Sequence, residues 1–182
     1  MKKIAVLFSG KGSNFAHLVD TLHGKTCHIA VALTNNPDAQ GIAIAKKASI
    51  PLEVIDSKTY PSREEFDAKV VACLQQYAPD LTVLAGFMRI LTPVFTEQVK
   101  SINLHPSLLP RHKGLHAIEK SYHDSYPNGG VSVHYVTSEL DGGDIIVQKE
   151  IAKSGLSFEA YDEKIRSLEK EALTEAISAV LK

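Results

Sequence analysis

Short apolar runs and longer amphipathic stretches alternate along this chain. Continuous apolar runs, such as residues 4–8 and 81–85, are typical of strands that are covered on both faces. Ser62-Arg63-Glu64-Glu65 has the form of a helix-capping box, and apolar residues at helical spacing follow it as far as Tyr77. In chain order we expect strands at residues 4–8, 28–34, 51–55, 81–85, 101–105, 131–136 and 145–149, and helices at about 14–22, 39–48, 62–77 and 157–182.

This alternation predicts the fold class. Strands separated by helices imply right-handed crossovers, and therefore an α/β fold with a doubly wound, mostly parallel sheet and helices on both faces. The length of 182 residues fits one domain, which we expect to span residues 1–182 with a Rossmann-like half at about 1–80 and a second half at about 81–182. In such sheets ligands bind beyond the carboxyl ends of the strands.

Composition narrows the class of partner. Twenty Lys and Arg against 21 Asp and Glu leave a net charge of -1, so no general attraction for nucleic acid or an anionic membrane is expected. No apolar segment approaches the roughly 20 residues that span a bilayer, and residues 9–12 interrupt the apolar start too early for a secretory signal. Cys27 and Cys73 lack the spacing of a disulfide framework or a zinc site, which predicts buried thiols in a reducing cytoplasm.

The loop Ser9-Gly10-Lys11-Gly12-Ser13-Asn14 lies between the first predicted strand and the first predicted helix. Its glycines permit a tight turn, and the free N–H groups of a helix N-terminus suit a phosphate. A dinucleotide site would need glycine in place of Phe15 and an acidic residue in place of Asn35-Asn36, and no Gly-Lys-Ser/Thr closes a P-loop. We therefore predict a site for a single phosphate monoester; the alternative is a ligand-free turn in which Ser13 or Asn14 caps the helix.

Asn103 and His105 stand at the end of a predicted strand, because Pro106 cannot donate to the sheet. Side chains alternate along a strand, so these two should share one face while Ile102 and Leu104 face the packed side. An amide N–H can donate to a developing oxyanion, and an imidazole can transfer a proton.

Asp141, in Leu140-Asp141-Gly142-Gly143, is the candidate partner of His105, since a nearby carboxylate favours the protonated imidazole. Together with Asn103, the two residues could serve acyl transfer through a tetrahedral intermediate. Separately, His105 is compatible with a structural role, and Asp141 with an ordinary turn between strands.

Four segments together carry a family resemblance. They are Gly10-Lys11-Gly12-Ser13-Asn14, Leu84-Ala85-Gly86-Phe87-Met88-Arg89-Ile90-Leu91, Asn103-Leu104-His105-Pro106-Ser107-Leu108-Leu109-Pro110 and Leu140-Asp141-Gly142-Gly143. The set resembles the phosphoribosylglycinamide formyltransferase family of the folate-dependent formyltransferases, over essentially the whole chain. Residues 103–143 are typical of the wider superfamily, and the loop at 12–14 points to this family.

The resemblance implies a role for each matching residue. It implies that the ribonucleotide is bound by Gly12, Ser13, Asn14, His116 and Glu169, that the folate is bound by Arg63, Met88, Arg89, Ile90, Leu91 and Asn103, and that catalysis uses Asn103, His105 and Asp141. From composition alone, Arg63 is equally well a solvated residue, and Met88 and Ile90 are ordinary packing residues. Glu169 falls on the apolar stripe of the terminal helix, where a salt bridge to Lys or Arg is the alternative to substrate binding.

The implied reaction is formyl transfer from 10-formyltetrahydrofolate, as co-substrate, to the amine of N1-(5-phospho-D-ribosyl)glycinamide in cytoplasmic purine biosynthesis. The amine would attack the formyl carbon directly, with His105 as general acid, Asn103 as hydrogen-bond donor and Asp141 as the charge partner. The expected partners are these small molecules alone, with no nucleic acid and no membrane, and the protein would be a monomer or homodimer. No metal is expected.

The chain departs from the family pattern in Arg111-His112-Lys113-Gly114-Leu115-His116, where Lys113 stands in a position that is often proline. We expect this loop to be differently shaped or more mobile, and Ala117 and Ile118 beside His116 are also less typical. His112 and His116 are four residues apart, but Gly114 between them and the lack of a local carboxylate argue against a metal site.

Two other functions stay open. One is another folate-dependent formyltransferase, acting on methionyl-tRNA or on a sugar nucleotide. The tRNA enzyme carries a further domain where this chain is expected to end in its helix, and the neutral charge does not favour tRNA. The other is a non-catalytic module that binds a mononucleotide or folate, which would have no need of Asn103, His105 and Asp141 together.

Overall fold

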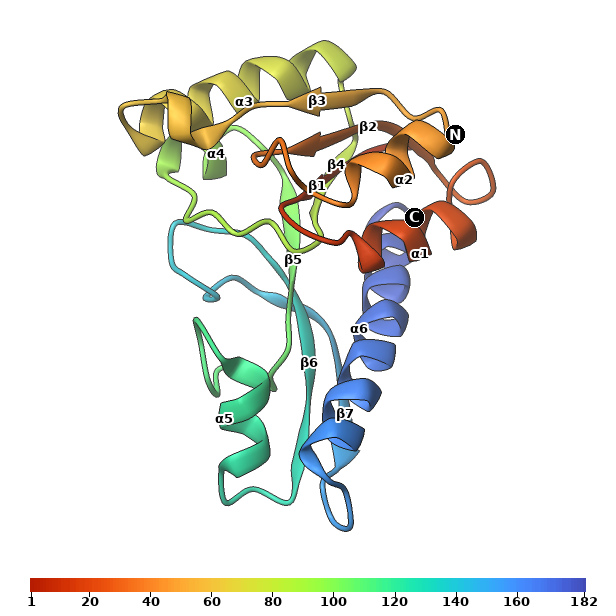
Figure 1. The fold of residues 1–182 in the computed structure, drawn as a ribbon, viewed down its shortest axis with the longest axis vertical. Helices are drawn as coiled ribbons and strands as arrows, with labels where there is room; N and C mark the ends of the chain where they lie inside the picture. Colours follow the sequence, from red (N-terminus) through yellow and green to blue (C-terminus); the bar gives the residue numbers. More distant parts are fainter. The chain divides into compact units, whose positions relative to one another are not determined.

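The computed structural model describes residues 1–182, and its strands form one seven-stranded sheet in the order β3-β2-β1-β4-β5-β6-β7 (Figure 1). The strands are β1 (Lys3–Phe8), β2 (His28–Thr34), β3 (Leu52–Val54), β4 (Leu81–Leu84), β5 (Ser101–His105), β6 (Asn128–Tyr135) and β7 (Ile145–Ala152). The helices are α1 (Ser13–Thr21), α2 (Ile42–Lys47), α3 (Arg63–Tyr77), α4 (Pro93–Thr96), α5 (Ala117–His123) and α6 (Phe158–Val180), with a short 3-10 helix at Ser57–Thr59.

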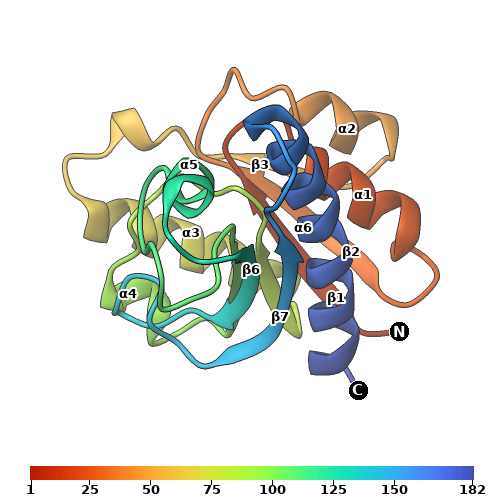
Figure 2. The same ribbon diagram turned by 90° about the horizontal axis from the view of Figure 1, so that it is seen from below.

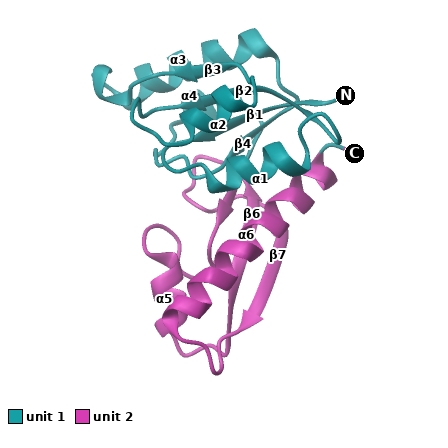
Figure 3. Cartoon of the chain, turned by 45° about the vertical axis from the view of Figure 1, so that its right-hand side comes forward, with its two compact units in different colours: residues 1–102, 181 teal, residues 103–180, 182 magenta.

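The chain divides into two compact units, residues 1–102 with Leu181 and residues 103–180 with Lys182 (Figure 3). β5 runs across this division, so Asn103 and His105 belong to the second unit. The expectation of a single domain over residues 1–182 stays a prediction.

The first unit has the topology of a doubly wound sheet. β1 pairs in parallel with both β2 and β4, and β2 pairs in parallel with β3. α1 and α2 lie on one side of these strands and α3 lies on the other (Figure 2). Because both faces are covered, residues 4–8 of β1 are fully buried. The predicted α/β fold with a mostly parallel sheet is therefore confirmed.

In the second unit, β6 and β7 form an antiparallel pair, and α6 packs against both strands. The buried positions of α6 recur at helical spacing. They are Tyr161, Ile165, Glu169, Ala172, Leu173, Ala176 and Ile177. Glu169 lies on the buried stripe as predicted.

Every predicted strand and helix is present, with ends that differ by a few residues. The largest differences are three residues, at the start of α2 (Ile42 rather than about 39), the start of β6 (Asn128 rather than 131) and the end of β7 (Ala152 rather than 149). Ser62 caps α3, since its hydroxyl accepts a hydrogen bond from the Glu65 N–H at 3.1 Å. The sequence did not predict α4 or α5, because a helix of four or seven residues is too short to display a clear apolar period.

Candidate active site

Two loops of the first unit meet at the carboxyl ends of β1 and β4, the point where the strand order reverses. The Ser9 N–H donates to the Gly86 carbonyl at 2.9 Å, and the Met88 N–H donates to Oγ of Ser9 at 2.8 Å. Ser9 in turn donates to Oδ1 of Asn35 at 2.5 Å. The glycine loop after β1 (residues 9–14) and the segment after β4 are thus joined at the usual ligand-binding edge of such a sheet.

The glycine loop at residues 9–14 leads into the N-terminus of α1, which has no side-chain cap. Gly12 is the N-cap of α1 with φ 74°, and a Cβ there would lie 3.0 Å from Cα of Gly41, so the position requires glycine. No side chain accepts a hydrogen bond from the first turn, so capping by Ser13 or Asn14 does not occur. Oδ1 of Asn14 is buried without a hydrogen-bond partner. The backbone donors of the first turn are therefore available to an anion.

The segment Met88–Leu91 has no regular secondary structure and presents apolar side chains to solvent. Met88 is 74% exposed and Ile90 is 58% exposed, so the alternative of ordinary core packing is wrong for both. The Arg89 guanidinium lies over the Phe66 ring at 4.9 Å. Leu91 is half-buried. Exposed apolar groups beside a fixed cation suit a flat ligand with a polar edge.

In the second unit, β5 ends at His105 as predicted from Pro106. Ile102 is fully buried as expected, but Leu104 is only half-buried while His105 is 6% exposed. The simple alternation of faces therefore fails at the strand end, because loops of the second unit cover the imidazole. Asn103 is half-buried on the same strand.

His105 and Asp141 form a buried pair, as the sequence suggested. Nδ1 of His105 lies 3.5 Å from Oδ2 of Asp141, and Nε2 of His134 lies 3.6 Å from Oδ1 of the same carboxylate. Burial opposes ionisation of Asp141, but His134, the Gly114 N–H and the charge of His105 outweigh it and lower the pKa of the carboxyl. Asp141 is thus held as an anion between two imidazoles.

The turn that carries Asp141 depends on the glycines that follow it. Asp141 has φ 52°, in the left-handed region. A Cβ on Gly142 would lie 2.4 Å from the Glu139 carboxyl carbon, and one on Gly143 would lie 1.7 Å from the Tyr135 carbonyl oxygen. The turn between β6 and β7 therefore requires both glycines, which explains the Leu-Asp-Gly-Gly sequence.

The loop after β5 contacts both members of the pair. Nε2 of His105 donates to the His112 carbonyl at 2.8 Å, since a carbonyl can only accept. The Gly114 N–H donates to Oδ2 of Asp141 at 2.9 Å. The His112 ring lies 2.7 Å from Oδ2 of Asp124 and so faces a carboxylate that the local sequence pattern did not reveal. No group of three or more His, Cys, Asp or Glu side chains is arranged to hold a metal ion.

Three further residues were predicted to contact ligands. Arg63 is exposed in the first turn of α3, and His116 is exposed at the N-cap of α5 with φ 60°. Glu169 is buried on α6. Their proposed contacts with ligands stay predictions.

Sequence reasoning did not assign roles to four residues that contact these groups, namely Ser9, His112, Asp124 and His134. The only available signal was the position of Ser9 beside the glycine loop. The other three act through partners distant in the sequence, which no local spacing indicates.

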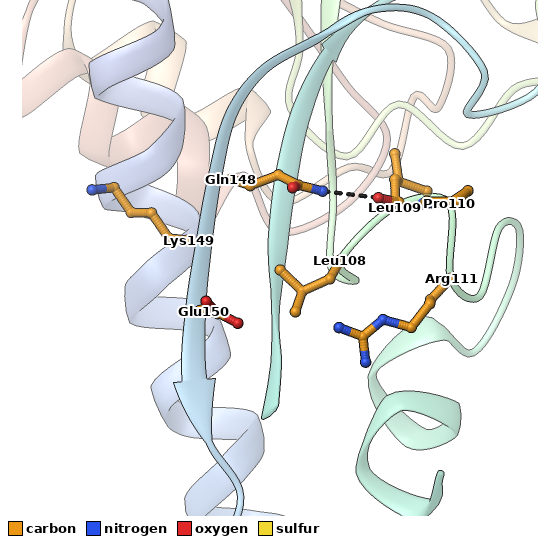
Figure 4. A pocket seen from close by; sticks show the side chains of 7 residues that line it. All are labelled: Leu108, Leu109, Pro110, Arg111, Gln148, Lys149 and Glu150. Atoms are coloured by element: carbon orange, nitrogen blue, oxygen red, sulfur yellow. Dashed lines mark hydrogen bonds between the residues drawn. The ribbon is translucent and has the colours of Figure 1, made fainter. Parts of the chain in front are cut away.

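The second unit has a cavity of about 300 Å³, which is lined by residues 108–111 of the segment after β5 and by residues 148–150 of β7 (Figure 4). None of the predicted site residues lines it. Within it, the Gln148 side-chain amide donates to the Leu109 carbonyl at 3.0 Å. Gln148 therefore fixes the segment that leads from His105 to His112.

Comparisons with known proteins identify the family of this chain. The sequence model of the formyl transferase family matches residues 2–177. Phosphoribosylglycinamide formyltransferase of Haemophilus influenzae is 41% identical over 155 residues, covering 83% of this chain and 73% of the relative. The trifunctional purine biosynthetic protein adenosine-3 of Bos taurus is 36% identical over 98% of this chain, which matches 18% of that longer protein.

Solved structures give the same result. The crystal structure of phosphoribosylglycinamide formyltransferase from Campylobacter jejuni has a TM-score of 0.97 and 50% identity, covering 100% of this chain and 98% of that one. The chain therefore belongs to the formyl transferase family, among the phosphoribosylglycinamide formyltransferases.

Proposed function

We propose that this chain transfers the formyl group of 10-formyltetrahydrofolate to the amine of N1-(5-phospho-D-ribosyl)glycinamide, in purine biosynthesis. The observation that carries this proposal is the buried pair of His105 and Asp141 in a chain of this family. A module that only binds ligands has no need of an anionic carboxylate held against an imidazole.

In the proposed reaction the amine attacks the formyl carbon and forms a tetrahedral intermediate. Asn103 donates a hydrogen bond to the developing oxyanion. His105, protonated, donates its proton to the departing folate nitrogen as the bond from that nitrogen to carbon breaks, and the neutral imidazole that remains accepts the proton that the attacking amine loses. Asp141 stabilises the imidazolium by its negative charge, which is supported by the lowered pKa of its carboxyl.

The first unit is proposed to bind parts of both substrates. Gly12, Ser13 and Asn14 bind the phosphate end of the ribonucleotide, supported by the uncapped N-terminus of α1, whose backbone N–H groups can donate to an anion. Met88, Arg89, Ile90 and Leu91 bind the folate, supported by the exposed side chains of Met88 and Ile90.

Arg63 is proposed to bind a folate carboxylate, for which an always-charged guanidinium is suited. His116 and Glu169 are proposed to bind the ribonucleotide.

The deciding experiment mixes the purified protein with 10-formyltetrahydrofolate and the ribonucleotide and follows the folate absorbance. The proposal expects release of tetrahydrofolate that requires both substrates. No change in absorbance, with both ligands shown to bind by calorimetry, would favour the non-catalytic module.

Two further properties belong to this proposal. A cytoplasmic location is supported by the free, buried thiols of Cys27 and Cys73. We expect a monomer or homodimer that needs no metal. No helix in the structure has the length and apolar character to cross a membrane.

A further inference from the structure

We propose that His112 is a positioning residue for formyl transfer, which acts by holding its backbone carbonyl against the ring of His105. This inference rests on the proposed function, in which His105 is the proton donor. It adds a residue to that machinery, together with the two side chains that hold it, Asp124 and Lys153.

The contact between His112 and His105 defines where the proton lies. The His112 carbonyl accepts a hydrogen bond from Nε2 of His105 at 2.8 Å, so Nε2 must carry hydrogen. Nδ1 faces the carboxylate of Asp141 at 3.5 Å. The ring thus has a hydrogen-bond acceptor on each side. These two contacts fix the orientation of the proposed general acid before substrate arrives, and the departing folate nitrogen must replace the His112 carbonyl as the acceptor when the proton is transferred.

One short loop orients both members of the pair. The Gly114 N–H, two residues after the His112 carbonyl, donates to Oδ2 of Asp141. His112 has φ 54° and Gly114 has φ 83°, so two left-handed residues direct these groups. Such a φ is unfavourable for histidine, and other contacts must hold the loop in this form.

Three hydrogen bonds hold the backbone just before His112. The Ser107 hydroxyl, fully buried, donates to the Arg111 carbonyl directly before it. The Ser132 hydroxyl accepts from the Leu109 N–H at 3.0 Å, and Gln148 binds the Leu109 carbonyl from the other side (Figure 4). These bonds fix the chain up to residue 111 and leave the direction of the next carbonyl to the His112 side chain.

The His112 ring is anchored by a fixed anion. Its Nε2 lies 2.7 Å from Oδ2 of Asp124, and Nζ of Lys153 lies 2.6 Å from Oδ1. Burial opposes ionisation of Asp124, but the hydrogen bonds from Lys153 and His112 outweigh it and lower the pKa of the carboxyl. Lys153 is itself held by the Ser121 carbonyl at 2.7 Å and the Asp124 carbonyl at 3.2 Å, near the end of α5. A loop that carries His112 is thus tied to a rigid point of the second unit.

The test replaces His112 with Phe, which keeps a ring but loses the bond to Asp124. Lys153 still neutralises that carboxylate, so the variant is expected to fold. We expect kcat to fall about tenfold to 100-fold through loss of orientation, while KM for each substrate changes less than about threefold. His112→Gln, whose amide N–H can reach the same carboxylate, should restore most of kcat. The matched control is His123→Phe, the same substitution at the exposed histidine next to Asp124 in the sequence. This control should retain wild-type kcat.

A second readout does not depend on turnover. In protein labelled with ¹⁵N-histidine, the Nε2–H signal of His105 should be sharp and protected in the wild type, lost in His112→Phe and recovered in His112→Gln. If wild type turns over no substrate but shows this pattern, the proposed function fails and the positioning contact stands. Unchanged kcat and Nε2–H signal in His112→Phe would overturn the inference, and so would equal losses in His112→Phe, His112→Gln and His123→Phe. If His112→Phe does not fold, kcat and the Nε2–H signal of His105 are measured in Asp124→Asn instead, and the same losses are expected there.

Discussion

Nδ1 of His105 lies 3.5 Å from Oδ2 of Asp141, and both side chains are almost fully buried at the end of β5 and in the turn after β6. We predict that His105→Ala and Asn103→Ala each lower turnover by on the order of 100-fold to 1,000-fold, because each removes a donor to charge that develops in the transition state. The formyl-transfer assay and circular dichroism measure activity and folding. His28→Ala, at an exposed position of the first unit, serves as the control. A wild-type rate in either site variant would remove that residue from the mechanism.

Asp141→Asn should alter stability as a function of pH. The pKa of the Asp141 carboxyl is lowered in the folded state from its ordinary 3.8, so its ionised form stabilises the protein at any pH above that value. This contribution is lost as pH falls through the lower folded-state pKa. We expect the variant to be less stable by on the order of 1 kcal/mol at about pH 6, and the difference to shrink below the ordinary pKa. Urea unfolding of both proteins between about pH 6 and about pH 2 measures this difference, and a difference that stays constant to the acid end would contradict the link.

Ser9→Ala should weaken binding of the formyl donor. The Ser9 hydroxyl accepts from the Met88 N–H and so ties the proposed folate segment to the end of β1. We expect KM for 10-formyltetrahydrofolate to rise severalfold with a smaller change in kcat, because the loss affects ligand binding in the ground state and transition state alike. Ser57→Ala, which loses only a 3.5 Å contact from Asn35 at the far end of the same network, is the matched control. Equal KM values in wild type and Ser9→Ala would show that the tie is unimportant.

Gly129→Ala should destabilise the fold without touching the proposed catalytic residues. A Cβ at this position of β6 would lie 1.8 Å from the hydroxyl oxygen of Tyr161, a fully buried side chain of α6. We expect a loss of about 1–3 kcal/mol in the free energy of unfolding, from overpacking. Gly10→Ala, where nothing lies within 4 Å of the added methyl, is the control. Combining Gly129→Ala with Tyr161→Phe removes the hydroxyl oxygen that the added methyl would meet, and should recover part of the lost free energy of unfolding. If nothing is recovered, the destabilisation has another cause.

Local patterns in the sequence predicted the elements and the fold class well. The periods of strands and helices are properties of neighbouring residues, which is why β2, β5 and α3 are present close to their predicted bounds. The need for glycine at position 12 and the stop at Pro106 were also readable, since both follow from the backbone of single residues.

Other features arose only when the chain folded. The apolar side chains of Met88 and Ile90 are exposed. A seven-residue helix, α5, follows the loop that contains Lys113. Neither outcome has a periodic signal, because exposure depends on what else packs nearby.

The sequence by itself determined the α/β fold, and it marked the glycine loop at residues 9–14 and the residues Asn103, His105 and Asp141 as candidates for the site. Only the tertiary structure decided that His105 is buried between Asp141 and the His112 carbonyl, and that Asp124 holds the His112 ring. The physical reason is distance along the chain. Asp141 is 36 residues after His105, and contacts at such separations depend on the path of the backbone, which local periodicity does not specify.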